Sequence, residues 1–76
     1  MFSNVCIGDK IKIEWKRESL SQVGQVFEVM QNGDFSVYVR EDAKFTMSHE
    51  FHKDGSPVEC DFIPKPMLPT AIGIVV

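Results

Sequence analysis

The sequence predicts an all-β fold, in which a small and mostly antiparallel barrel or strongly bent sheet of five or six strands forms one domain over residues 1–76. Apolar and polar residues alternate along several short segments, as they do in strands with one buried face. Asn32-Gly33 and Asp54-Gly55 are turn signals between such segments. The chain has 76 residues, and a chain of this length supports a single hydrophobic core.

The first strand is expected within Val5–Trp15, where strict alternation follows Gly8-Asp9. One face of this strand would carry Ile11, Ile13 and Trp15, and the other would carry Lys10, Lys12, Glu14 and Lys16. The polar segment Lys16–Gln22 is expected to be an exposed loop with at most one helical turn.

A hairpin is expected over Val23–Arg40. Asn and Gly both tolerate positive φ, so Asn32-Gly33 predicts a two-residue type I′ turn between its strands. The second strand would direct Phe35, Val37 and Val39 to the core. Alternation breaks in the first strand, and a β-bulge near Phe27-Glu28 would place both Val26 and Val29 inside. Residues 41–44 would form a charged connection.

A second hairpin is expected around Asp54-Gly55, with Phe45–His52 as its first strand. The inner face of that strand would carry Phe45, Met47, His49 and Phe51. A two-residue loop would pair Phe51 with Val58, His49 with Cys60, and Met47 with Phe62, and would set Glu50 opposite Glu59.

The C-terminal part of the chain is expected to leave the sheet and then return to it. Three prolines in Pro64–Pro69 cannot donate ladder hydrogen bonds, which predicts an extended, polyproline-like crossover. Thr70–Val76 would form the last strand, with Gly73 at a bend or a close approach. This apolar strand needs to pair within the chain or across a dimer.

Charge and cysteine usage limit the classes of function. The net charge is −3, and residues 41–61 carry six acids against two lysines. An acidic chain argues against a dedicated nucleic-acid binder, although a local basic face remains open. The N-terminus lacks a signal-peptide pattern, and no apolar run is long enough to span a membrane. Cys6 and Cys60 form no Cys-x-x-Cys pair, so reduced thiols and a cytoplasmic location are expected.

No motif predicts an enzyme, a cofactor or a metal site. His49 beside Cys60 could bind zinc or form a thiolate–imidazolium pair, but four ligands or an oxyanion hole would be required. We interpret the pair as a core histidine beside a buried thiol. The string His49-Glu50-Phe51-His52 differs from the metalloprotease motif, because its histidines are three apart in a strand pattern.

Candidate binding residues project outward from the first strands, namely Lys10, Lys12, Tyr38 and Arg40. Basic residues around an aromatic ring are typical of single-stranded nucleic-acid binding, and also of ordinary solvated strand faces. The acidic segment 41–61 could meet a basic partner surface, imitate a nucleic-acid backbone, or be an ordinary soluble face. Pro66-Met67-Leu68-Pro69 has the P-x-x-P form without the usual basic neighbour.

Residues 7–40 resemble the opening of SH3-like small barrels, including those of the KOW type. The resemblance is carried by Gly8-Asp9-Lys10-Ile11-Lys12-Ile13, Gly24-Gln25-Val26-Phe27-Glu28-Val29, Asn32-Gly33 and Phe35–Val39. It implies a non-enzymatic module that binds RNA, ribosomal or polymerase surfaces, or peptides. The chain departs from RNA-binding KOW members in its acidity and its bulky Gln25 and Phe27, and from peptide-binding SH3 domains in lacking their clustered acidic and aromatic groove residues.

We therefore expect a small protein-binding or regulatory module that docks on a larger protein or complex, without a membrane. One alternative is an RNA- or DNA-binding module that uses Lys10, Lys12, Tyr38 and Arg40. The other is a structural homo-oligomer that pairs through Thr70–Val76.

Overall fold

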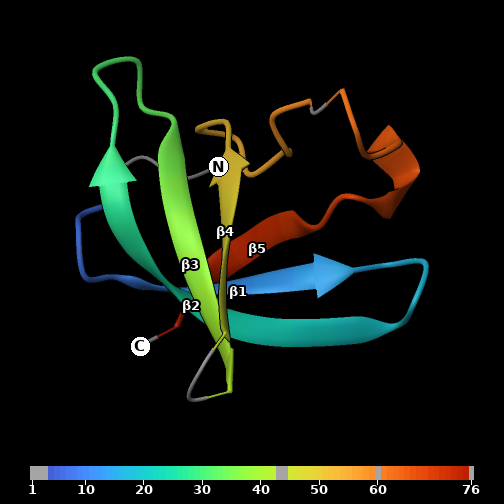
Figure 1. Cartoon of the computed structure of the whole chain (residues 1–76). Helices are drawn as coiled ribbons and strands as arrows, with labels where there is room; N and C mark the ends of the chain where they lie inside the picture. The colour runs from blue at the N-terminus through green and yellow to red at the C-terminus, as the bar shows by residue number, and fades with distance from the viewer. Residues whose placement is uncertain (1–3, 43–44, 60, 76) are drawn as a thin grey trace.

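The computed structural model describes residues 4–42, 45–59 and 61–75, without the side chains of 40–42 and 45–46. The strands of this part of the chain form one antiparallel sheet in the order β4-β3-β2-β1-β5. The elements are β1 Lys10–Trp15, β2 Leu20–Val29, β3 Phe35–Asp42, β4 Phe45–Phe51, the 3-10 helix η1 Lys65–Met67 and β5 Thr70–Val75. The sheet is strongly bent and is not closed, which confirms the predicted all-β class (Figure 1).

The bend is made by β2, which belongs to both halves of the sheet (Figure 1). Its first half pairs with β1 and its second half with β3. The register shifts between Val26 and Glu28, which confirms the predicted bulge. Val26 is buried as predicted, but Val29 is 37% exposed. The strand also begins at Leu20, because Leu20–Gln22 pairs with β1 and is not the expected loop.

Both glycine turns are three-residue loops, which corrects the predicted two-residue turns. Gly33 N donates to the Met30 carbonyl at 3.1 Å, and Met30 N donates to the Asp34 carbonyl at 2.8 Å. Gly55 N likewise donates to the His52 carbonyl at 2.8 Å. Each loop has positive φ only at its glycine, +95° at Gly33 and +92° at Gly55. This geometry matches a type I turn followed by a glycine bulge. The sequences x-Asn-Gly and x-Asp-Gly are compatible with this loop as well as with the two-residue type I′ turn.

The second hairpin therefore has a different register from the predicted one. Phe51 pairs with Pro57 and not with Val58, and Val58 N donates to the Glu50 carbonyl at 3.1 Å. Since a shift of one residue exchanges the faces of a strand, the predicted pairing of Glu50 with Glu59 is absent. No strand forms after Pro57 within the described residues up to 69, so Met47 is not paired with Phe62. Cys60 lies outside the described residues.

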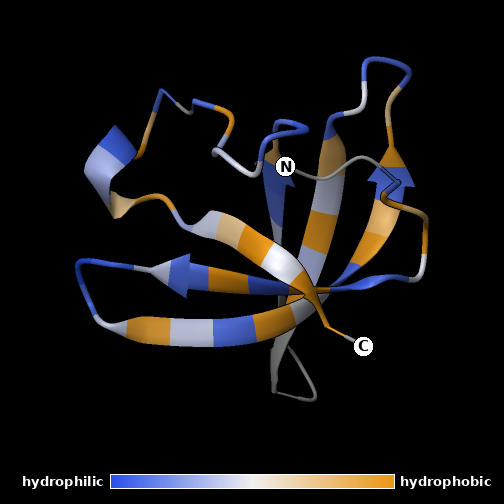
Figure 2. Cartoon of the chain, turned by 180° about the vertical axis from the view of Figure 1, so that it is seen from behind, coloured by the Kyte–Doolittle hydropathy of each residue, from blue (hydrophilic) through white to orange (hydrophobic). Residues whose placement is uncertain are grey.

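The core occupies the concave side of the sheet and follows the predicted faces, except that Met47, predicted on the inner face, is 38% exposed. Its buried side chains are Ile11, Ile13, Val26, Phe35, Val37, Val39, Phe51 and Ala71. Figure 2 shows the alternation of apolar and polar residues along the strands that produces this face. Gly24 lies against this core: an added Cβ there would meet the Val37 side chain and would come within 2.7 Å of the Tyr38 carbonyl oxygen.

The crossover leaves the sheet as predicted but is not wholly extended. Met67 N donates to the Pro64 carbonyl and Leu68 N to the Lys65 carbonyl, which forms the turn of η1. β5 then pairs with β1, with a bulge that precedes Gly73. An added Cβ at Gly73 would meet no atom within 4 Å, so the close approach expected there is found instead at Gly24. No helix in the described ranges is long and apolar enough to cross a membrane.

Candidate functional site

A shallow hollow lies on the convex face of the sheet, where β1, β2 and β3 run side by side. Lys10, Gln25 and Tyr38 form one row across these strands. With Val23 and Gly24 they line a space of about 370 Å³, which we call the outer hollow. Two of the four predicted binding residues, Lys10 and Tyr38, are thus brought together.

The other two predicted residues, Lys12 and Arg40, lie in different rows of the sheet from Lys10 and Tyr38. Lys12 is exposed and lies opposite Val23, in the next row along the sheet. Arg40 follows Tyr38 by two residues on β3, so alternation puts it on the same face, but its side chain lies outside the described part of the structure. The prediction of a binding role for these residues stays a prediction.

The aromatic ring of the outer hollow is held in place on two sides. The Tyr38 hydroxyl donates to Gln25 Oε1 at 3.1 Å. The ring of Phe27 lies 5.9 Å from that of Tyr38, centroid to centroid, because the bulge turns Phe27 toward the convex face. Gln25 and Phe27 therefore hold the Tyr38 ring in place, whereas the sequence pattern had indicated Tyr38 alone.

A second depression, which was not predicted from the sequence, lies between β4 and residues 57–59 and 63–69. We call it the β4 cleft, and its volume is about 300 Å³. Apolar side chains make up most of its lining, namely Phe51, Pro57, Val58, Ile63, Leu68 and Pro69. Ser48, His49, Glu50 and Glu59 complete it. A cleft with an apolar lining and a few polar groups is typical of binding sites.

The rim of the β4 cleft is acidic and its outer lip is apolar. Glu50 and Glu59 are both exposed at the rim. Lys65 Nζ lies 3.9 Å from Glu59 Oε1, which is a weak and exposed contact. Phe62 is 94% exposed beside this cleft, and Ile63 is also exposed. Exposed large apolar side chains next to an apolar cleft indicate an interaction surface.

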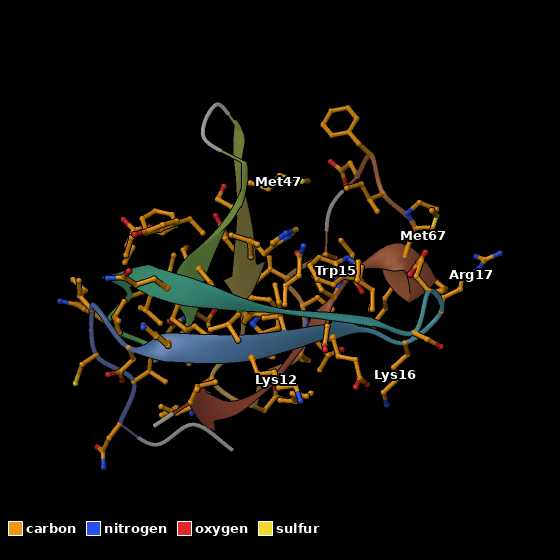
Figure 3. All side chains as sticks on the ribbon, turned by 90° about the horizontal axis from the view of Figure 1, so that it is seen from below. Lys12, Trp15, Lys16, Arg17, Met47 and Met67 are labelled. Carbon is orange, nitrogen blue, oxygen red and sulfur yellow. The ribbon has the colours of Figure 1, made fainter. Side chains whose placement is uncertain are left out.

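His49 lines the β4 cleft and packs against two other aromatic side chains. Its ring packs edge-on against Trp15 with centroids 5.5 Å apart, and lies 6.4 Å from the ring of Phe51. Figure 3 shows Trp15 on the side of β1 that faces Met47 and Met67, with Lys12 on the opposite side. His49 is thus a half-buried rim residue, while its predicted neighbour Cys60 is not described.

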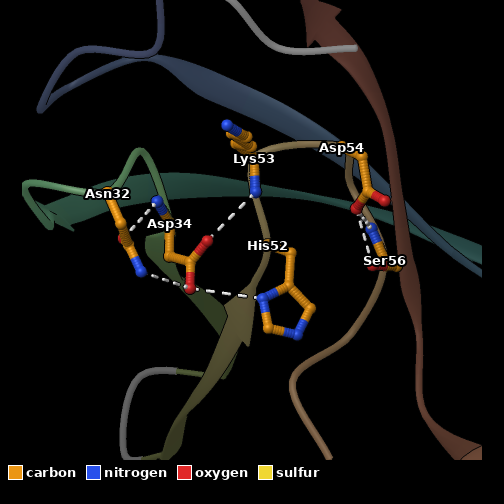
Figure 4. A network of polar contacts seen from close by, with 6 residues as sticks. All are labelled: Asn32, Asp34, His52, Lys53, Asp54 and Ser56. Atoms are coloured by element: carbon orange, nitrogen blue, oxygen red, sulfur yellow. Dashed lines mark hydrogen bonds and ion pairs between the residues drawn. The ribbon is translucent and has the colours of Figure 1, made fainter.

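A polar network joins the two glycine turns, where β3 begins and β4 ends (Figure 4). Asp34 Oδ2 lies 3.2 Å from His52 Nδ1 and accepts from Asn32 Nδ2, while Asp34 Oδ1 accepts from Lys53 N at 3.3 Å. A carboxylate can only accept, so Nδ1 carries the proton in the contact with His52. Asp34 thereby ties the β2–β3 turn to the turn after β4.

Within the second turn, Asp54 Oδ1 accepts from the Ser56 hydroxyl at 2.6 Å and from the Ser56 N–H at 2.9 Å (Figure 4). These bonds favour the charged carboxylate and hold the pKa of Asp54 below its ordinary value of 3.8. The pair stabilises the loop that positions Pro57 and Val58 on the wall of the β4 cleft.

Neither surface offers a metal-binding constellation. Across the described ranges, no group of three or more His, Cys, Asp or Glu side chains is placed to hold a metal ion. Comparisons with protein-family models, with curated proteins and with solved structures found no match for this chain. The geometry of the outer hollow and of the β4 cleft is therefore the basis for assigning a function.

Proposed function

We propose that this chain is a small non-enzymatic protein-binding module of SH3-like type, which works in the cytoplasm and takes a short segment of a partner protein in the β4 cleft. The observation that carries the proposal is the cleft itself, with an apolar lining and two exposed glutamates at its rim. Its occupant is an extended peptide with one apolar anchor and an adjacent basic side chain.

Charge and burial support this occupant. Burying one Leu-sized side chain is worth about 1.5–3 kcal/mol, and a basic neighbour would meet Glu50 and Glu59. Exposed ion pairs add at most about 1 kcal/mol each, so charge selects the ligand more than it strengthens binding. A minimal dipeptide should then bind in the millimolar range, which corresponds to about −4 kcal/mol. Phe62 and Ile63 extend the contact surface for a longer segment.

A two-part experiment tests the proposal. N-acetyl-leucyl-arginine amide should shift the methyl NMR signals of Ile63 and Leu68 in a saturable way, and N-acetyl-leucyl-glutamate amide should not. The double variant Glu50→Lys/Glu59→Lys should reverse this preference. Both glutamates are exposed, so we expect the fold to survive. Equal shifts with both dipeptides, or none with either, would contradict a basic and apolar ligand.

The protein partner itself is sought by retention from nuclease-treated extract of the source cells. The wild-type chain and the matched variant Lys10→Glu/Lys12→Glu should retain the same protein, and Glu50→Lys/Glu59→Lys should lose it. Loss in the Lys10 and Lys12 variant alone would instead favour the outer hollow.

A second candidate function, binding of single-stranded nucleic acid, is favoured by the outer hollow. Lys10 and Tyr38 lie in one row of the sheet with Gln25 between them, and Lys12 follows in the next row. A base stacked on an aromatic ring with lysines on the backbone is the general mode of such binding.

Oligo(dT) is the probe for this second function. Two phosphate contacts predict a slope of about −1.4 for log K against log salt, and Lys10→Glu/Lys12→Glu should abolish binding. Absence of binding at low salt would exclude this role for the outer hollow. The variant Lys53→Glu/Lys65→Glu is the matched control, because it makes the same change of charge at two exposed lysines that do not line the outer hollow.

A further inference from the structure

β5 is an edge strand without the usual protection. It pairs with β1 alone within the described part of the chain, and its six residues include no charge and no proline. Ile72, Ile74 and Val75 are 46%, 44% and 40% exposed. Natural edge strands are normally protected by charges, proline or a covering segment, because an open edge pairs with other chains.

The opposite edge of the sheet shows what such protection looks like. β4 is covered at its end by the chain itself, because Phe51 pairs with Pro57 and Glu50 accepts from Val58 N. On β5 the covering contact is at Ala71, whose N–H donates to the Gly55 carbonyl at 2.9 Å. The open edge is therefore Ile72–Val75.

We propose that this edge pairs with the same edge of a second copy of the chain. Two copies of β5 related by a two-fold axis run antiparallel, and their sheets become continuous. With the axis near Gly73, Ile72 of each copy lies beside Ile74 of the other. Such an interface is self-complementary, as a two-fold dimer requires.

Charge favours a second copy over a foreign charged strand. β5 has no charged side chain to meet one, whereas identical apolar edges place no like charges opposite each other. The nearest lysines, Lys10 and Lys12, are on β1. The β1 strands of the two copies would be three strand spacings apart, or about 14 Å. That distance exceeds the Debye length of about 10 Å at 0.1 M salt, so the lysines would hardly repel.

The test measures mass and amide exchange of the intact chain from micromolar to millimolar concentration. We expect the mass to rise from 8.6 kDa to about twice that value, and the amides of Ile72–Val75 to become protected over the same range. Ile74→Lys should raise the dimer Kd at least tenfold, because it places a charged side chain against the apolar Ile72 of the other copy at two places in the interface. Met67→Lys is the matched control, since Met67 is equally exposed at 44% but lies in η1.

Three results would overturn the proposal. A mass of 8.6 kDa at the highest concentration, with amides of Ile72–Val75 that exchange freely, would refute it directly. A dimer that survives Ile74→Lys would use another surface. Protection that appears only when other proteins are added would assign the edge to a foreign strand. If Ile74→Lys fails to fold by circular dichroism, the exchange data on the wild-type chain still decide.

Discussion

Replacing Gly24 with alanine should strongly destabilise this protein although it adds one methyl group. Gly24 pairs with Ile11 in the middle of the sheet, and the new Cβ would collide with the Val37 side chain. It would also lie 2.7 Å from the Tyr38 carbonyl oxygen and 3.1 Å from Val39 Cγ2. A main-chain oxygen cannot rotate away as a flexible side chain can. Overpacking of a core costs about 1–3 kcal/mol, and we expect about 3 kcal/mol here.

Gly73→Ala is the matched control, because its Cβ would meet no atom within 4 Å and its φ is not in the left-handed region. We expect it to be neutral or more stable by about 0.4–1 kcal/mol, through a less flexible unfolded chain. Urea unfolding, followed by the fluorescence of the single tryptophan Trp15, measures the free energy of unfolding of both variants. The Tm of Gly24→Ala should fall by roughly 12–24 °C. A Gly24→Ala variant within about 0.5 kcal/mol of the wild type, or an equal loss in both variants, would refute the reasoning.

Three further substitutions test other parts of the structure. Asp54→Asn should lower the free energy of unfolding at neutral pH, and the difference from the wild type should vanish in acid, where the wild-type carboxylate is protonated below its lowered pKa. Urea unfolding at neutral pH and in acid measures this difference, and an equal difference under the two conditions would contradict the Ser56 contacts. Asp34→Ala should cost about 1–2 kcal/mol in thermal unfolding through its lost turn contacts, and the exposed Asp61→Ala should cost nearly nothing. Phe35→Ala should cost about 3–5 kcal/mol, so a folded circular dichroism spectrum near 25 °C with an unchanged Tm would refute its place in the core.

The strand faces could be predicted because they depend on local alternation. Ile11 and Ile13 point to the core for the same reason as Phe35 and Val37, namely that successive side chains point to opposite sides of a strand. The bulge near Phe27 was predicted on the same basis, since it appears as a break in that period. These features require no knowledge of distant residues.

The turns and the β4 cleft were missed for two different reasons. Asn-Gly and Asp-Gly suit both two-residue and three-residue loops, and the choice shifts the register after Gly55 by one residue. The cleft depends on how residues 57–59 and 63–69 pack beside β4. No local sequence pattern specifies this packing. Cleft residues such as Ile63 and Leu68 carry no signal beyond their apolar character. The outward direction of Lys10 and Tyr38 was predicted from strand alternation, but the hydrogen bond from Tyr38 to Gln25 was not.

The pairing of β5 with β1 also has a consequence for folding kinetics. The pairs β1–β2, β2–β3 and β3–β4 join neighbouring strands, whereas β5 contacts a strand about 60 residues earlier in the chain. Because closing a long loop costs chain entropy before any contact is gained, we expect the three local hairpins to form first and β5 to dock last. During that interval the apolar strand Thr70–Val75 is open to the β1 of another molecule. Refolding at high concentration should therefore produce domain-swapped species, and dilute refolding should avoid them.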